Sequence, residues 1–251
     1  MPQFLVAPED LSPERFVLRG PEAFHVSKVM RCREGEAIEV FDGKGGRYSG
    51  VIETVGEDAV EGRITGVLHA AKKSTKVRLS LYLGLLKASR FEWALEKATE
   101  VGVSVIVPVL TPRTVVQLRE ESSGRKLERW NKILVAAAKQ CGRADLPELK
   151  APAHFRDAIA EAIHSGLTLM GWPKSSGASA SLQETLARHR QQKESLDVSL
   201  FVGPEGGFTK EEAELAEVEG AHLFHLKATT LRGETAAIVA SALILHDLGS
   251  L

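Results

Sequence analysis

Apolar residues alternate with polar ones between Glu36 and Leu68, in the segments EAIEVFDG, YSGVIETVG and AVEGRITGVL. A repeat of two residues is typical of short, half-buried strands. Asp42-Gly43 and Gly45-Gly46 follow the first segment and tolerate the positive φ angles that a tight hairpin needs. The pattern therefore predicts a small antiparallel sheet or barrel in this part of the chain.

Beyond Val77 the pattern changes to nearly continuous apolar runs separated by helical segments. Such runs are typical of strands that are covered on both faces of a sheet. They are residues 77–86, 103–110, 167–172, 197–203 and 222–226. About five strand–helix units follow one another, which is typical of a parallel α/β sheet with ligand sites at the carboxyl ends of its strands.

Helices are predicted between these strands. One begins at Ser89, in a capping box with Glu92, and ends before Gly102. Its apolar stripe consists of Phe91, Leu95, Ala98 and Val101. A basic helix covers residues 125–139, and the last helix covers residues 234–248. The inward positions of the basic helix are Leu127, Trp130, Leu134 and Ala137 or Ala138.

A charged stretch, HAAKKSTK at residues 69–76, stands where the strand-only pattern gives way to strands and helices. We expect a linker there, between domains of residues 1–72 and 73–251. Residues 73–150 carry 15 basic and 8 acidic side chains, whereas residues 1–72 carry 9 and 12 and residues 151–251 carry 8 and 13. The positive middle third suits contact with phosphate groups, although a solvated helix face gives the same count.

No membrane segment is predicted. The longest apolar stretch, residues 236–245, is interrupted by Ser241 and is far shorter than the roughly 20 residues of a membrane-spanning helix. Residues 1–10 lack the basic and apolar pattern of a signal peptide. We therefore expect a cytoplasmic protein.

The positions of the cysteines and histidines argue against a metal site, a disulfide and a nucleophilic cysteine. Cys32 and Cys141 are far apart and have no C-x-x-C partner. Cys141 follows a helix whose dipole disfavours a thiolate. His222 and His225 fall on opposite faces of a predicted strand. Since the sequence also has no H-E-x-x-H, no G-x-S-x-G and no Walker loop, it favours a reaction that mainly positions an already activated donor.

The segment LFVGPEGGFTKEE joins a strand to a helix through Gly203, Pro204, Glu205, Gly206 and Gly207. The helix opens with a second capping box, formed by Thr209 and Glu212. Three glycines in five residues let backbone lie against a ligand with no Cβ in the way. We interpret the segment as a binding loop; the alternative is a tight turn.

A second strand-to-helix loop, in the segment LKATTLRGETAA, contains Arg232 and Glu234. Arg232 either binds an anion through two N–H groups of its guanidinium or forms an ordinary ion pair with Glu234 or Glu205. The residues by themselves favour the ion pair.

A third loop follows the basic helix, which we expect to end at Gly142. Lys139, Gln140 and Arg143 lie around this end. They either contact phosphate or a base edge, or they form a solvated helix end.

Several segments together resemble the ribosomal small subunit methyltransferase E family, RNA uridine N3-methyltransferases of the SPOUT class. They are FVGPEGGFTKEE, FEWALEKATEVGV, KLERWNKILVAAAKQCGRADLP, LRGETAA and, at residues 25–50, HVSKVMRCREGEAIEVFDGKGGRYSG. The resemblance covers nearly the whole chain in the same order. The GPEGG loop and the AAKQ-x-GR segment are specific in combination.

The resemblance implies an α/β fold with a SPOUT-type parallel sheet and a trefoil knot, plus a small PUA-like β-barrel. It also implies a homodimer that acts on small-subunit (16S) ribosomal RNA with S-adenosylmethionine as cofactor and without a metal. The implied cofactor-binding residues are Met170, Gly171, Gly203, Pro204, Glu205, Gly206, Gly207, Leu226, Lys227, Leu231 and Arg232. The implied RNA-binding residues are Arg15, Arg31, Lys139 and Arg143.

The last loop departs from the family's pattern. Lys227, Ala228 and Thr229 stand where members usually have Gly, Pro and Arg, and Gly233 stands where they have Thr. This departure motivates an alternative function, a non-catalytic RNA-binding or ribosome-assembly factor on the same fold.

Two other enzyme classes are disfavoured. Ribose 2′-O-methyltransferases of the same class resemble one another in an asparagine–arginine motif, and the only asparagine here is Asn131, inside the basic helix. An enzyme with a nicotinamide cofactor is disfavoured because no G-x-G-x-x-G follows a predicted strand.

For the implied reaction we expect direct methyl transfer to N3 of a uridine held out of its stack. N3 of neutral uracil carries a proton, so the site must remove it or stabilise the resulting anion, whose charge spreads onto O2 and O4. Arg232 is the first candidate for this stabilisation and Arg143 the second. Glu234 either orients Arg232 or accepts the proton through water.

Overall fold

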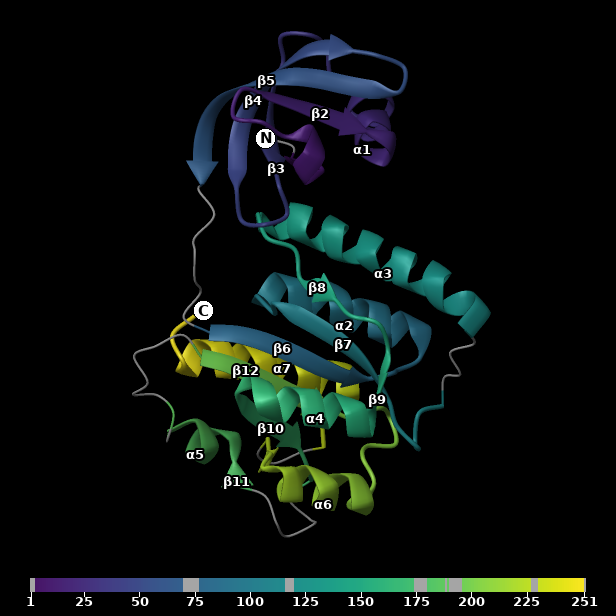
Figure 1. Cartoon of the computed structure of the whole chain (residues 1–251), viewed down its shortest axis with the longest axis vertical. Coiled ribbons are helices and arrows are strands. Elements are labelled where there is room, and N and C mark those ends of the chain that lie inside the picture. Colours follow the sequence, from purple (N-terminus) through teal and green to yellow (C-terminus); the bar gives the residue numbers. More distant parts are fainter. Residues whose placement is uncertain are drawn as a thin grey trace. The chain divides into compact units, whose positions relative to one another are not determined.

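The computed structural model describes residues 3–69, 77–115, 120–173, 180–187, 189, 196–226 and 230–250 (Figure 1). The chain divides into two compact units, each of which is described by itself. The first comprises the described residues of Met1–Lys73 and Val135–Leu146, and the second those of Ser74–Leu134 and Pro147–Leu251. Apart from His69, the predicted linker at residues 69–76 lies outside the described residues.

The described part of the first unit contains a five-stranded sheet in the order β1-β3-β4-β5-β2. Its strands are β1 (Gln3–Leu5), β2 (Arg15–Arg19), β3 (Ala37–Phe41), β4 (Arg47–Val55) and β5 (Ala59–His69). β1 runs parallel to β3, and the other pairs are antiparallel. The predicted hairpin joins β3 to β4, where the Asp42 carboxylate accepts hydrogen bonds from the amides of Lys44 at 2.7 Å and Gly46 at 2.8 Å. The predicted small antiparallel sheet is thereby confirmed.

Short helical segments complete the first unit. They are the 3-10 helix η1 (Pro8–Asp10), α1 (Gly20–Phe24) and the π-helix η2 (His25–Val29). α1 and η2 bury Ala23 and Val26 in the core of this unit, beside Phe4 and Phe16. The strand pattern gave no sign of these segments.

The described part of the second unit contains an eight-stranded sheet in the order β11-β13-β10-β12-β6-β7-β8, with β9 paired to β7. Its strands are β6 (Val77–Gly84), β7 (Val105–Leu110), β8 (Glu148–Leu149), β9 (Ala153–His154), β10 (Leu167–Gly171), β11 (Ala180–Ser181), β12 (Leu196–Val202) and β13 (His222–His225). Each of these pairs is parallel, which confirms the predicted α/β class. Strands β8, β9 and β11 were not predicted, because two residues are too few to show a period.

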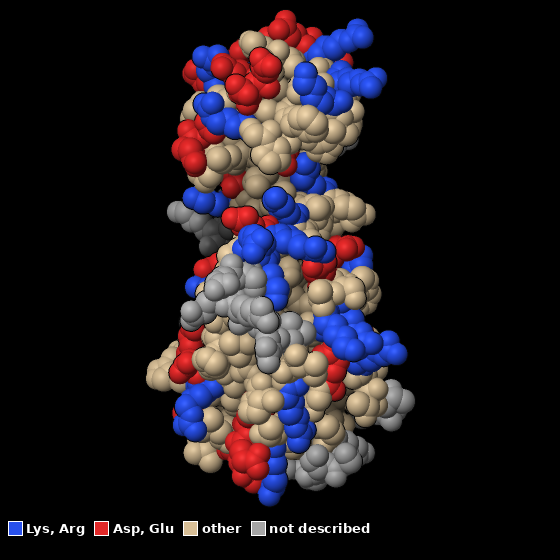
Figure 2. Space-filling model, turned by 90° about the vertical axis from the view of Figure 1, so that its right-hand side faces the viewer, with Lys and Arg blue, Asp and Glu red and all other residues tan. Residues whose placement is uncertain are grey.

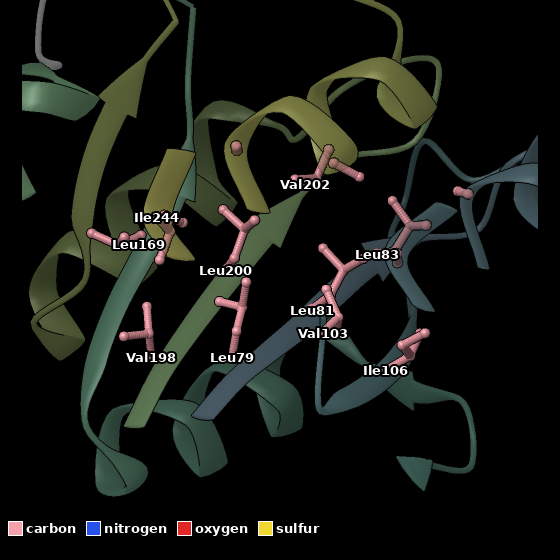
Figure 3. Close-up of a cluster of buried hydrophobic side chains, with 14 of the residues drawn as sticks. Leu79, Leu81, Leu83, Val103, Ile106, Leu169, Val198, Leu200, Val202 and Ile244 are labelled. Carbon is pink, nitrogen blue, oxygen red and sulfur yellow. The ribbon is translucent and has the colours of Figure 1, made fainter. Parts of the chain in front are cut away.

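The helices are α2 (Ala88–Val101), α3 (Glu120–Cys141), α4 (Phe155–Ser165), α5 (Leu182–Ala187), α6 (Lys210–Glu219) and α7 (Gly233–Asp247). α2 and α7 lie on one face of the parallel sheet, and α4 and α6 lie on the other (Figure 1). Leu79, Leu81 and Leu83 of β6 point to the α2 and α7 face, whereas Tyr82 points to the α4 face. Figure 3 shows these leucines beside Leu200 and other buried side chains of the neighbouring strands. Both faces are covered, which explains why the strands read as apolar runs.

The two predicted capping boxes have different outcomes. Thr209 and Glu212 form the predicted box at the start of α6, with hydrogen bonds of 3.2 and 2.7 Å. The box predicted for Ser89 is wrong, because Lys87 occupies the N-cap of α2 and no side chain of its own caps it. Glu92, the expected partner of Ser89, instead forms an ion pair with Arg129 at 2.7 Å.

Two expected absences can be compared with the described residues. In that part of the chain, no helix is both long and apolar enough to cross a membrane. The same residues contain no group of three or more His, Cys, Asp or Glu side chains placed to hold a metal ion.

Candidate functional site

Four parallel strands end at one edge of the sheet. Strands β13, β10, β12 and β6 are neighbours and run in the same direction, so their carboxyl ends share that edge. Gly84, at the end of β6, lies against Pro204, and a Cβ at Gly84 would overlap the Pro204 nitrogen. At Gly233 a Cβ would lie 3.0 Å from the Gly203 carbonyl oxygen. The loop after β12 therefore packs directly between the end of β6 and the start of α7.

The backbone conformation and close contacts within the protein explain why this loop contains glycines. Gly207 has a φ of 66°, which favours glycine. A Cβ at Gly203 would lie 3.0 Å from the Cα of Gly207, and one at Gly206 would lie 3.0 Å from the Cβ of Arg113. The number of glycines alone therefore does not distinguish a binding loop from a tight turn.

Glu205 faces the start of α2. Its Oε1 accepts a hydrogen bond from the backbone N–H of Lys87 at 3.0 Å and lies 3.7 Å from Nη1 of Arg90. Arg90 Nε also lies 3.8 Å from Oε1 of Glu234. Glu205 thus caps α2 from a distant loop, and the Arg90 guanidinium holds this loop residue together with Glu234 at the start of α7.

Glu234 lies in the first turn of α7, where the helix dipole favours a negative charge. The residue is only 8% exposed. Its second oxygen, Oε2, has no hydrogen-bond partner among the described residues. Glu234 is therefore a buried carboxylate that Arg90 and the helix end balance.

Arg232 occupies the N-cap of α7 and is exposed. In the described part of the chain it forms no ion pair, so the ion pair that the residues favoured is wrong. The partner of Glu205 and Glu234 is Arg90. Arg232 therefore takes no part in holding these two carboxylates.

The remaining candidate cofactor residues differ in exposure. Met170 is fully buried in the core on the α4 side of the sheet. Gly171, Leu226 and Leu231 are half-buried, and Lys227 lies outside the described residues.

Sequence reasoning missed Arg90 and Arg113. Arg90 follows the carboxyl end of β6, the neighbour of β12, and Arg113 follows the carboxyl end of β7, the next strand in the sheet. Their position directly after predicted strands was the available signal.

The other candidates lie in the first unit. Arg143 forms an ion pair with Asp145 at 2.6 Å that leaves the Arg143 side chain largely buried. Burial raises the pKa of Asp145, but the hydrogen bond and charge of Arg143 outweigh it, and the pKa lies below its ordinary value. Their loop is fixed to the β3–β4 turn, because the Leu146 N–H donates to Gly43 at 2.9 Å and the Gly45 N–H donates to Ala144 at 3.0 Å.

Lys139 is also engaged within the first unit. Its Nζ lies 2.9 and 3.1 Å from the two carboxylate oxygens of Glu22 and 5.1 Å from the centroid of the Phe4 ring. Arg15 and Arg31 are exposed. Arg15 lies 3.6 Å from Glu61, whereas Arg31 has a φ of 54°, which is rare for a residue with a side chain.

Comparison with known families agrees with this architecture. A family model described as an RNA methyltransferase domain matches residues 73–245, and one described as an RNA methyltransferase PUA domain matches residues 18–65. The parallel sheet and these matches define an RNA methyltransferase with a PUA domain.

Similarity to individual proteins identifies the family within this class. The chain is 30% identical over 244 residues to ribosomal RNA small subunit methyltransferase E of Synechocystis sp., covering 96% of this chain and 76% of the relative. It is 26% identical over 234 residues to the Bacillus subtilis enzyme of the same name, covering 92% and 90%. The chain belongs to the ribosomal RNA small subunit methyltransferase E family, which confirms the resemblance.

Solved structures share the fold over their whole length. A methyltransferase of Legionella pneumophila, in complex with the bound cofactor SAM, is 30% identical with a TM-score of 0.85, covering 97% of this chain and 96% of that one. Ribosomal RNA small subunit methyltransferase E of Neisseria gonorrhoeae, bound to S-adenosyl methionine, is 26% identical with a TM-score of 0.84, covering 98% and 97%.

Proposed function

We propose that the chain transfers the methyl group of S-adenosylmethionine to N3 of a uridine in small-subunit 16S ribosomal RNA. The observation that carries the proposal is that the loop at residues 203–207 packs between the end of β6 and the start of α7, at the sheet edge where β13 also ends, in a chain whose relatives of known structure bind this cofactor. Family membership supports ribosomal RNA as the substrate.

The residues at this edge fit the cofactor. Half-buried Gly171, Gly203 and Gly207 present backbone with no side chain, and half-buried Leu226 and Leu231 present apolar surface for an adenine ring. We assign cofactor binding to these residues and to Met170, Pro204, Glu205, Gly206, Lys227 and Arg232. When bound, S-adenosylmethionine supplies a methyl group on a positively charged sulfur.

In the proposed reaction the N3–methyl bond forms as the sulfur–methyl bond breaks, and its electron pair stays on sulfur. The proton of N3 leaves to water. Arg232 stabilises the negative charge that develops on O2 and O4 of the uracil, because it is exposed and lies at the positive end of the α7 dipole. Glu234 accepts the proton through water. Arg143, the second candidate in the sequence, is bound to Asp145 in the first unit, so we assign this role to Arg232.

The test is calorimetric titration with S-adenosylmethionine and with its demethylated product, followed by methylation of 16S RNA and mapping of the modified base. We expect binding of both ligands and N3-methyluridine as product. Replacing Arg232→Gln should lower kcat by about 10²-fold, while Arg78→Gln, at the opposite end of β6, should leave kcat unchanged.

Other outcomes separate the alternatives. A folded protein that binds RNA but neither ligand is the non-catalytic assembly factor. Methylation of a ribose hydroxyl instead of N3 would contradict the proposed base chemistry.

We propose that RNA contacts the first unit at Arg31 and Arg15. Arg31 follows the π-helix η2, and such helices are frequent at functional sites. Phe24, which is 61% exposed, and the exposed Met30 lie in the same segment and offer surface on which bases stack. Figure 2 shows Lys and Arg side chains interspersed with acidic ones on the displayed face, so net charge alone does not mark the RNA surface there.

We also propose that residues 1–72 act as a PUA-like RNA-binding barrel and residues 73–251 as a SPOUT methyltransferase domain with a knotted cofactor site. The bounds of the two family models support this division.

The proposed place of action is the cytoplasm, where ribosomal RNA is found. The proposed assembly is a homodimer, supported by exposed apolar side chains on α7.

A further inference from the structure

We propose that Arg113 is a positioning residue for the cofactor loop, in a role that rests on the proposed use of S-adenosylmethionine. Its Nη1 donates hydrogen bonds to the carbonyl oxygens of Gly206 and Phe208, both at 3.0 Å. One guanidinium nitrogen therefore bridges two peptide groups on either side of Gly207. Arg113 belongs to a different loop, more than 90 residues earlier in the chain.

The turn that carries Arg113 is itself fixed. The Thr111 N–H donates to Oγ1 of Thr114 at 3.0 Å, and the Thr114 N–H donates to the Thr111 carbonyl at 3.0 Å. These bonds close the turn directly after β7, and Thr111 is buried. Arg113 thus reaches the loop after β12 from a rigid base rather than from a freely moving segment.

Gly206 provides the space for this contact. A Cβ at Gly206 would lie 3.0 Å from the Cβ of Arg113 and 3.4 Å from its carbonyl oxygen. These contacts are tighter than ordinary van der Waals contact, so a side chain at this position would require Arg113 to shift. Gly206 and Arg113 therefore pack closely against each other, and glycine leaves room for the arginine.

The contact fixes the orientation of the loop's peptide groups. Arg113 holds the carbonyls of Gly206 and Phe208, and the N–H of Gly207 donates to the Pro204 carbonyl at 2.8 Å. A loop held in this way pays less ordering entropy when a ligand binds to its backbone. Loss of the guanidinium should lower cofactor affinity without changing the chemical step.

The test compares Arg113→Gln and Arg113→Lys with Arg78→Gln, an exposed arginine paired with Glu148 at the other end of the sheet. We expect Arg113→Gln to raise the Kd and KM for S-adenosylmethionine about tenfold, since two hydrogen bonds are lost. The kcat at saturating cofactor should stay within twofold and the Tm within a few degrees. Arg113→Lys should restore part of the affinity, and Arg78→Gln should bind as the wild type does.

A double-mutant cycle with Gly206→Ala makes the test specific. Both changes disrupt the same contact. The Kd of the double variant for S-adenosylmethionine should therefore be no higher than that of the single variant with the higher Kd. Full additivity would overturn the proposal, and so would unchanged affinity in Arg113→Gln or a large Tm loss that Arg113→Lys does not restore. A wild-type protein that binds no S-adenosylmethionine overturns the proposed function and this proposal with it.

Discussion

Lys139 lies at the end of α3, where its ammonium group forms an ion pair within the first unit. Its side chain is 17% exposed and lies between the carboxylate of Glu22 and the ring of Phe4. Glu22 is in the first turn of α1, so the ion pair fastens α3 to this short helix. The geometry favours a stabilising role, whereas Arg31 has the exposure that a phosphate contact needs.

We predict that Lys139→Ala lowers the free energy of unfolding by about 2 kcal/mol, because it leaves the largely buried Glu22 without its partner. The salt dependence of RNA binding should change little. Arg31→Ala should instead keep the stability and lower the slope of log K against log salt by about one. Urea unfolding and RNA titrations at several salt concentrations check both. A lower slope with unchanged stability in Lys139→Ala would restore its RNA role.

Among the helices, α6 begins with a capping box whose acidic member is buried. Oε2 of Glu212 accepts the Thr209 N–H at 2.7 Å, and Oε1 has no partner among the described residues. Burial raises the pKa of Glu212 above its ordinary value of 4.5, in spite of the opposing hydrogen bonds and the charge of Arg113. The charged form of this side chain is therefore costly in the folded state.

We predict that Glu212→Gln is at least as stable as the wild type at neutral pH, by up to about 1 kcal/mol, since glutamine also completes a capping box. The folded state binds the Glu212 proton more tightly than the unfolded state does, so this side chain stabilises below pH 4.5 and loses that stability as the pH rises through the raised pKa. The advantage of glutamine should therefore vanish in acid. Unfolding curves from pH 4 to 8 check this; an advantage that grows in acid would contradict it.

The two helix starts also show what the sequence can predict. The start of α6 was predictable because Thr209 and Glu212 are three residues apart. The start of α2 was not, because Glu205, which takes the Lys87 N–H, lies 118 residues away. The strands and the converging loops follow from local periodicity and parallel order, but the clamp of Arg113 on Gly206 depends on which strands become neighbours. Long-range partners of this kind leave no local pattern.

At the scale of the whole molecule, the surface of α7 carries a sign of a partner. The helix buries Ala237, Ala240 and Ile244 against the sheet. Val239 and Leu243, one turn apart, are 36% and 42% exposed. A helix that is apolar on more than one face is usually covered on more than one face. A second copy of the chain would cover this one, which is the proposed homodimer.

We predict that the wild type is a dimer in solution and that Leu243→Glu dissociates it, because the change places a charge in the proposed interface. Light scattering should then give the mass of one chain, 27.2 kDa, instead of twice that mass. Val218→Glu is the matched control: Val218, in α6, is 85% exposed and lies between Glu217 and Glu219, so the dimer should persist. Since α7 also carries Glu234 in its first turn, methylation should fall at least tenfold in the dissociated variant. A Leu243→Glu protein that stays dimeric would place the interface elsewhere.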